Sequence, residues 1–275
     1  MHDDKSHDSR RDHYTHGYAE PVIRAHAART VQNSAEYVLP YLHLGMTVLD
    51  LGCGPGTITT GLAELVTPGT VIAADIDPGI LARAAEYAAS QGVATIDFRL
   101  TSGYDLDLDD DSVDLAHAHQ VLQHVSDPVA VLCELRRVVR PGGIIAIRES
   151  DYGAFTWHPA SEGLERWLEL YVRAARANGG EPYAGRHLLA WAHQAGLSDV
   201  QATSSTKTYV AGESARWWAG VWAERIRASA VATQLLESGW ASEADLDEIS
   251  QAWLRWGDDP DAWFMLPGGE IVATV

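Results

Sequence analysis

A short apolar segment that runs directly into alternating glycines constrains the fold of this chain most. Residues 47–51 read Thr-Val-Leu-Asp-Leu, and residues 52–56 read Gly-Cys-Gly-Pro-Gly. An apolar run bounded by turn residues is typical of a buried strand. Glycine allows a tight turn and a close approach of the backbone to a ligand. A helical pattern follows over 56–66, and the amide groups at its start face that turn. The segment therefore predicts a strand, a binding turn and a helix.

The same alternation of strand and helix continues to about residue 150. We expect strands at 70–75, 95–100, 112–119 and 144–149, and helices at 21–41, 77–91 and 127–139. The last two helices each begin with Asp-Pro, a pairing that supplies an N-cap acceptor and a proline suited to the first helical position. This order predicts an α/β fold with a mostly parallel sheet and an antiparallel edge strand.

The second half of the chain has a different character. All ten tryptophans lie beyond residue 150, and apolar residues of 164–175 recur at helical spacing. We expect helices at 186–195, 213–238 and 243–256, a strand at 200–210, and an edge strand at 270–275. Residues 1–18 are then a flexible tail or lid, 19–150 a cofactor-binding core, and 151–275 a helical cap with the final core strands. Most tryptophans are expected in the core of this cap, and a few in the substrate pocket.

Composition narrows the possible partners. Twenty Lys and Arg against 38 Asp and Glu give a charge of −18, which repels phosphate backbones and argues against nucleic acid. Two cysteines form no disulfide framework, and no apolar run is long enough to insert in a membrane. We therefore expect a cytoplasmic protein that acts on a small molecule; a homo-oligomer is compatible with the sequence.

Four histidines near the N-terminus raise the question of a metal. His2, His7, His13 and His16 are irregularly spaced and accompanied by no cysteine. This pattern favours a solvated tail, and we predict no metal site.

The glycine segment resembles the first motif of class I S-adenosylmethionine methyltransferases. A dinucleotide-binding fingerprint has a third glycine where this chain has Thr57. The resemblance implies an S-adenosyl-L-methionine cofactor, with S-adenosyl-L-homocysteine as product. It implies that the turn holds the methionine part, that Asp75 binds the ribose and that Ile76 packs on the adenine. The turn residues concerned are Asp50, Gly52, Cys53, Gly54, Gly56 and Thr57.

Two later segments extend the resemblance. Ser102 and Gly103 stand where the family has Gly-Asp, and they are expected at the adenine edge. Residues 114–125 resemble the fourth-strand region, which places His119 and Gln120 at the cofactor. Residues 135–143 resemble the menaquinone and ubiquinone C-methyltransferase group.

The resemblance implies methyl transfer to a C or O atom of a small apolar metabolite that is aromatic, quinone-like or isoprenoid. The methyl of a sulfonium is already activated, so such an enzyme chiefly aligns donor and acceptor. Side chains expected to orient or deprotonate the acceptor are Glu149, His158 and His124, with Tyr14 and Tyr18 closing over the cofactor. Two alternatives remain open at this point: a nicotinamide-dependent oxidoreductase and a non-catalytic binding protein with a cofactor fold.

Overall fold

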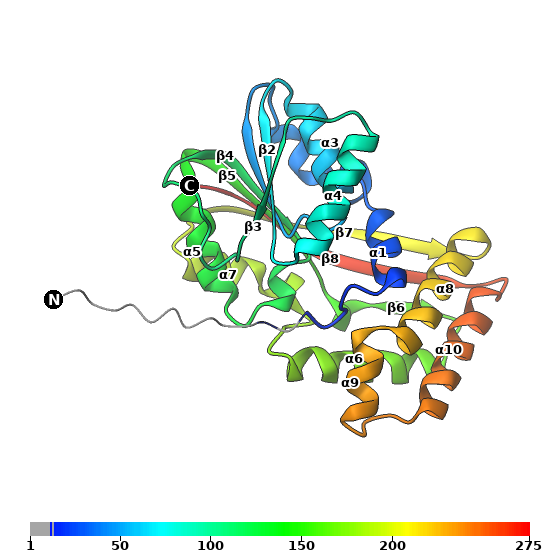
Figure 1. Cartoon of the computed structure of the whole chain (residues 1–275). Helices are drawn as coiled ribbons and strands as arrows, with labels where there is room; N and C mark the ends of the chain where they lie inside the picture. The colour runs from blue at the N-terminus through cyan, green and yellow to red at the C-terminus, as the bar shows by residue number, and fades with distance from the viewer. Residues whose placement is uncertain (1–11, 13) are drawn as a thin grey trace.

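A single mixed sheet of eight strands organises the molecule, and helices pack on both of its faces (Figure 1). The computed structural model describes residues 12 and 14–275. The strands are β1 (Thr47–Leu51), β2 (Thr70–Asp75), β3 (Ile96–Leu100), β4 (Val113–His119), β5 (Val139–Ser150), β6 (Thr156–His158), β7 (Asp199–Val210) and β8 (Trp263–Thr274). The sheet order is β3-β2-β1-β4-β5-β8, with β7 and β6 both paired to β8.

The first five strands are parallel, as the alternation in the sequence predicts. Successive residues of β1 point to opposite faces. Leu49 packs with α5 (Pro128–Val138) and α7 (Leu188–Gln194) in one apolar core. Val48 packs with α2 (Val31–Ser34) and α3 (Thr57–Val66) in another. Helix α4 (Pro78–Ser90) connects β2 to β3. Burial on both faces explains why β1 and β2 are largely apolar.

The final strand differs from the prediction in position and length. β8 begins at Trp263, seven residues earlier than expected, and it lies between β5 and β7 rather than at the sheet edge. It is antiparallel to both neighbours, so the edge is formed by β7. The sheet is therefore mostly parallel, with its antiparallel strand one position inside the edge.

Two predicted helices are each interrupted. The segment 21–41 forms α1 (Glu20–Ala27), α2 and a 3-10 helix, η1 (Glu36–Tyr41). Thr30 is extended and caps α2 through reciprocal hydrogen bonds with Asn33. The segment 213–238 forms α8 (Glu213–Ala228) and α9 (Ala230–Glu237), because Ser229 adopts an extended backbone. The side-chain cap at Thr30 therefore begins a second helix inside the segment that the apolar spacing predicts as one.

Helices α6 (Glu162–Ala177), α8, α9 and α10 (Glu243–Gly257) pack into a unit that we call the cap (Figure 1). Its centre is aromatic: Trp167, Trp222 and Trp253 are fully buried, and Phe264 of β8 joins them. Trp167 meets Trp222 edge-on at a centroid distance of 4.4 Å. In the part of the chain that the structure describes, no helix is long and apolar enough to cross a membrane.

The aromatic centre of the cap predicts a large loss of stability on truncation. Trp167→Ala should lower the free energy of unfolding by about 3–5 kcal/mol, because it leaves a cavity among rigid rings. Trp263→Ala, at a side chain that is 37% exposed, is the matched control and should change it by less than about 1 kcal/mol. Urea unfolding followed by circular dichroism measures both. Equal losses in the two variants would contradict this description of the cap.

Candidate cofactor and acceptor site

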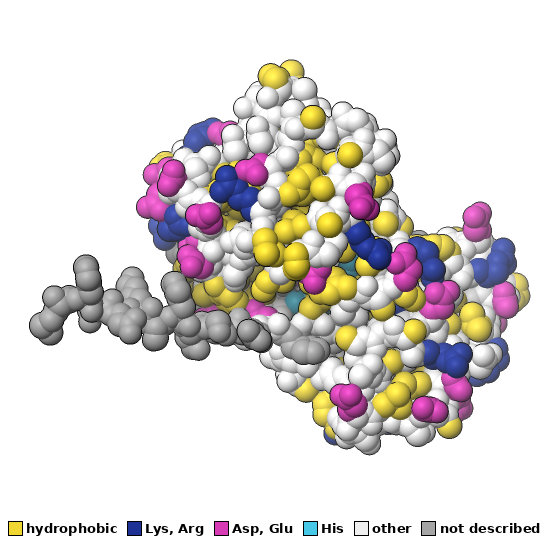
Figure 2. Space-filling model, in the orientation of Figure 1, with side chains coloured by type: hydrophobic (Ala, Val, Ile, Leu, Met, Phe, Trp, Pro, Cys, Tyr) yellow, Lys and Arg dark blue, Asp and Glu magenta, His cyan; other side chains and the backbone are white. Residues whose placement is uncertain are grey.

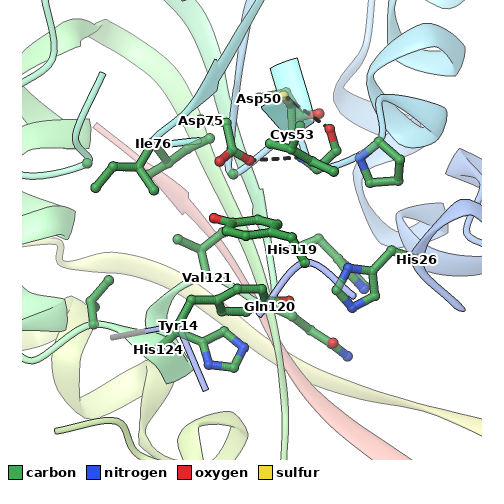
Figure 3. A pocket seen from close by; sticks show the side chains of 18 of the residues that line it. Tyr14, His26, Asp50, Cys53, Asp75, Ile76, His119, Gln120, Val121 and His124 are labelled. Atoms are coloured by element: carbon green, nitrogen blue, oxygen red, sulfur yellow. Dashed lines mark hydrogen bonds between the residues drawn. The ribbon is translucent and has the colours of Figure 1, made fainter. Parts of the chain in front are cut away.

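A pocket opens at the carboxyl ends of β1, β2 and β4, where ligands of open α/β sheets bind (Figure 3). Its walls come from the glycine turn, from the residues after β2, β3 and β4, and from the N-terminal segment through α1. Apolar side chains gather around this hollow, and a histidine is visible at its floor (Figure 2). The predicted residues that line it are Tyr14, Tyr18, Asp50, Gly52, Cys53, Gly54, Thr57, Asp75, Ile76, Ser102, Gly103, His119, Gln120 and His124.

The glycine turn is shaped for close approach of a ligand. Gly52 and Gly54 have φ values of +69° and +53°, in the left-handed region that favours glycine. A Cβ on Gly54 would meet no atom within 4 Å, so that position is open. Gly56 is different, because a Cβ there would lie 2.9 Å from the Cβ of Ala84 on α4. Gly56 is outside the pocket lining, and the structure places it in helix packing instead of at a cofactor.

Asp50 is buried beneath the turn, and each of its carboxylate oxygens accepts a hydrogen bond. One oxygen accepts the Thr59 hydroxyl of α3 at 2.6 Å, and the other accepts Nδ1–H of His117 on β4 at 2.8 Å. The acid therefore ties the end of β1 to the following helix and to the neighbouring strand. Asp50 lines the pocket, but both of its oxygens bind protein side chains.

Asp75 ends β2 at the opposite side of the turn. Its carboxylate accepts the backbone N–H of Gly54 at 3.1 Å and that of Asp77 at 3.1 Å. Burial raises the pKa of this carboxyl. Each oxygen keeps a further lone pair for a ligand hydroxyl. Ile76 beside it is 61% exposed, an unusual state for isoleucine and one that an aromatic ring of a ligand would cover.

Gln120, which directly follows β4, has an uncommon backbone conformation. Its φ is +58°, which is uncommon for a residue with a Cβ. Its amide group accepts from Arg29 Nη2 at 2.6 Å and donates to the Ser150 hydroxyl at 2.6 Å. His119 precedes it, buried, and burial together with Arg29 lowers the pKa of its imidazole well below the usual range.

Tyr14 and His124 form the wall that faces the glycine turn (Figure 3). Their rings meet edge-on at a centroid distance of 4.8 Å, and Tyr18 packs 5.2 Å from Tyr14. Burial raises the pKa of both tyrosines and, with Arg29 and Arg225, lowers the pKa of His124 to about 3. All three side chains are therefore neutral near pH 7.

His16 corrects the expectation of a solvated tail. It is buried, its Nδ1 accepts from Arg225 Nη2 of α8 at 2.6 Å, and its Nε2 lies 3.0 Å from the Tyr171 hydroxyl of α6. Because guanidinium only donates, Nδ1 carries no proton and the ring is neutral. Thr15 is held by Asn178, so the cap fixes residues 14–18 over the pocket. His2, His7 and His13, like residues 1–11 of the predicted tail as a whole, lie outside the described residues.

Glu149 lies elsewhere than predicted. Its carboxylate is fully buried and accepts three backbone N–H groups, from Val121, Leu122 and Gln123, at 2.9, 2.7 and 3.3 Å. It therefore stabilises the loop after β4 and does not line the pocket. The position of a residue at a strand end predicts the edge it reaches, but not the direction of its side chain.

His158 is also separate from the pocket. It lies on β6 with an exposed side chain, its backbone paired with Trp263 and its carbonyl accepting the Trp256 indole N–H. No tryptophan lines the described pocket either, so the few that were expected there lie elsewhere. The cap acts on the pocket indirectly, by holding the N-terminal segment.

Sequence reasoning missed His26 and Arg29. His26 lies in the last turn of α1 and Arg29 in the loop that follows it, and both line the pocket. Neither belongs to a motif, and only the packing of this segment beside the sheet brings them there. Their spacing of three residues within the predicted helix 21–41 was the available signal. Among the residues with defined positions, no group of three or more His, Cys, Asp and Glu could hold a metal ion.

Comparisons with known proteins agree with this geometry. Residues 42–202 match the family model described as a methyltransferase domain. An uncharacterized methyltransferase of Schizosaccharomyces pombe is 31% identical, over 94% of this chain and 95% of its own length. A ubiquinone biosynthesis O-methyltransferase of Cereibacter sphaeroides is 30% identical over 56% of this chain and 65% of its own. A phosphoethanolamine N-methyltransferase of Haemonchus contortus, solved with S-adenosylhomocysteine, has a TM-score of 0.53 at 18% identity, covering 85% of this chain and 49% of that one.

The chain belongs to the methyltransferase domain family, and it is an S-adenosylmethionine-dependent methyltransferase of Rossmann-like fold. The pocket fits that cofactor: Gly54 leaves open space, Asp75 has free acceptor positions and Ile76 is exposed beside it. Because the chain belongs to this family, the alternative of a nicotinamide-dependent oxidoreductase is rejected.

Removing the Asp75 carboxylate should weaken cofactor binding. Hydrogen bonds to a charged group contribute about 1.5–3 kcal/mol, so Asp75→Ala should raise the dissociation constant for S-adenosylhomocysteine roughly tenfold to 150-fold. Asp97→Asn, at an exposed acid paired with Arg99, is the control and should leave it unchanged. Isothermal calorimetry measures both variants. Unchanged affinity in Asp75→Ala would exclude ribose recognition at this residue.

Glu149 predicts a distinct pH dependence of stability. Burial raises its pKa to about 8 from an ordinary value of 4.5. Between these pH values the unfolded chain loses a proton that the folded chain keeps, so this contribution to stability is present below about pH 4.5 and lost as pH rises through about 8. Urea unfolding at pH 5 and pH 8.5 should show a drop in wild type that is smaller in Glu149→Gln. The same drop in both proteins would show that Glu149 does not titrate in this window.

Proposed function

We propose that this methyltransferase transfers the methyl group of S-adenosylmethionine to an oxygen or carbon atom of a small, largely apolar metabolite, aromatic, quinone-like or isoprenoid in character. The observation that supports this most is the continuity of one pocket from the glycine turn to the Tyr14–His124 wall. Apolar side chains make up much of the lining: Val22, Ile23, Ile58, Ile80, Val121, Val125 and Val131.

For the cofactor, we propose the following placement. The glycine turn and the start of α3 face the methionine part, Asp75 accepts from the ribose, and Ile76 and Ser102 flank the adenine. Arg29 is the candidate for the methionine carboxylate. It lines the pocket, and no described acid lies within ion-pair distance of it. A carboxylate matches the planar donor pattern of guanidinium.

The bound cofactor supplies an activated methyl group. What the chain adds, in this proposal, is alignment and exclusion of water by Tyr14, Tyr18 and His124. Burial and the nearby guanidinium groups hold His124 neutral, with a pKa of about 3, so it takes up a proton poorly. It can orient an acceptor through a hydrogen bond. Glu149, which the sequence suggested as a base, lies outside the lining.

The ubiquinone biosynthesis O-methyltransferases among the relatives favour an oxygen acceptor on an aromatic ring. The experiment that tests the proposal uses purified protein, S-adenosylmethionine labelled in its methyl group, and fractionated metabolite extracts. Label should enter a small organic-soluble product with wild type and not with Gly54→Val, whose branched side chain occupies the open position of the turn. Label found only in protein or nucleic acid would contradict a small acceptor.

Replacing Arg29 tests the contact with the methionine carboxylate separately from the contacts with the adenosine part of the cofactor. Arg29→Met should weaken S-adenosylhomocysteine binding about tenfold to 150-fold, the range of a charged hydrogen bond. The same variant should bind 5′-methylthioadenosine as wild type does, because that compound has no carboxylate. Calorimetry with both ligands measures the difference. Equal weakening of both ligands would show that Arg29 acts on the fold of the pocket and not on the carboxylate.

A further inference from the structure

Arg225 is a buried cation without a counter-charge. Its residue is 4% exposed, its Nη2 donates to His16, and its guanidinium lies 4.3 Å from the ring centroid of Trp222. Its Nε has no hydrogen-bond partner. No carboxylate of the described residues lies within ion-pair distance of it, whereas Arg148, the other buried arginine, pairs with Glu270 at 3.2 Å. An isolated buried charge is unfavourable, so its retention here calls for an explanation.

The guanidinium group of Arg225 lies one layer of side chains behind the Tyr14–His124 wall. His16, which it contacts, has its ring centroid 5.4 Å from that of His124 and 5.9 Å from that of Tyr14. Burial raises the pKa of Tyr14 and the charge of Arg225 opposes that shift; burial lowers the pKa of His124, and Arg29 and Arg225 lower it further. Its field therefore reaches the pocket side of this wall.

Two guanidinium groups, Arg29 and Arg225, thus act on the pocket without an acid partner in the described part of the chain. The cofactor brings one carboxylate, and that group satisfies Arg29 in the proposed placement. None of the acids that line the pocket lies within ion-pair distance of Arg225: Asp50 and Asp75 lie beside the glycine turn, and Asp12 accepts from Ser126 N–H. In this placement Arg225 is the guanidinium left to act on the acceptor, in a protein of net charge −18.

We propose that the methyl acceptor binds as an oxygen anion, a carboxylate or an ionised acidic hydroxyl on an apolar body, against the Tyr14–His124 wall in the field of Arg225. This rests on the proposed function and names the acceptor class of the same site. An oxygen anion attacks the sulfonium methyl, the new O–C bond forms as the S–C bond breaks, and the two charges cancel. No proton remains to be moved, which agrees with a wall of neutral side chains.

The test compares each anion with its neutral methyl derivative on protein saturated with S-adenosylhomocysteine, so that Arg29 is occupied. One arm uses benzoate and methyl benzoate; the other uses 4-nitrophenolate at pH 8.5 and 4-nitroanisole. Wild type should bind the anion about tenfold more tightly in at least one arm, the size expected for a charge across one layer of protein. The arm that responds distinguishes a carboxylate from an ionised hydroxyl.

Three variants test whether Arg225 causes the preference for the anion over its neutral methyl derivative. Arg225→Met should bring the affinity ratio near one, and Arg225→Lys, which keeps the charge, should retain part of it. Arg227→Met, an exposed arginine of the same helix paired with Asp247, should keep the wild-type ratio. No anion preference in either arm of wild type, or full preference in Arg225→Met, would overturn the inference. Failure of wild type to bind S-adenosylhomocysteine in the first step would instead contradict the proposed function.

Discussion

The buried carboxylate of Asp50 is the contact on which the site depends. It joins the end of β1 to α3 through Thr59 and to β4 through His117, so three elements meet at one acid. The glycine turn that follows can then adopt positive φ values without being stabilised by a side chain of its own. A buried acid needs such partners, because an unpaired one would be strongly unfavourable. The turn therefore starts from a fixed point, and Asp75 of β2 meets it by accepting the Gly54 N–H.

A second junction holds the other wall of the pocket. His16 and Thr15 are bound by residues of α6, α8 and the loop after α6, which lie more than 150 positions away in the chain. The aromatic cap therefore contributes to the site by fixing Tyr14 and Tyr18 rather than by presenting its own tryptophans. The charges follow the same division. Asp50 and Asp75 lie on the side of the glycine turn, and the two guanidinium groups lie on the side of the N-terminal segment.

What the sequence could predict was local. Neighbouring residues specify the strand, turn and helix at 47–66 and the position of Asp75 at the end of its strand. The alternation of strands and helices predicts that the first five strands are parallel. Glu149 shows the limit, because residue order does not reveal that three amide groups of the loop after β4 surround it. His16 and Arg29 show another limit. His16 lies in a polar segment and Arg29 in the loop after α1, and only distant partners make them part of the site.

The central claim is that one continuous pocket holds the cofactor between the glycine turn and the N-terminal segment and presents its methyl group to the Tyr14–His124 wall. A crystal structure with S-adenosylhomocysteine tests it most directly. The account predicts ribose hydroxyls on Asp75, the methionine carboxylate on Arg29, and the sulfur facing the space bounded by Tyr14 and His124. A complex in which the sulfur faces away from that space, or the carboxylate lies remote from Arg29, would contradict it.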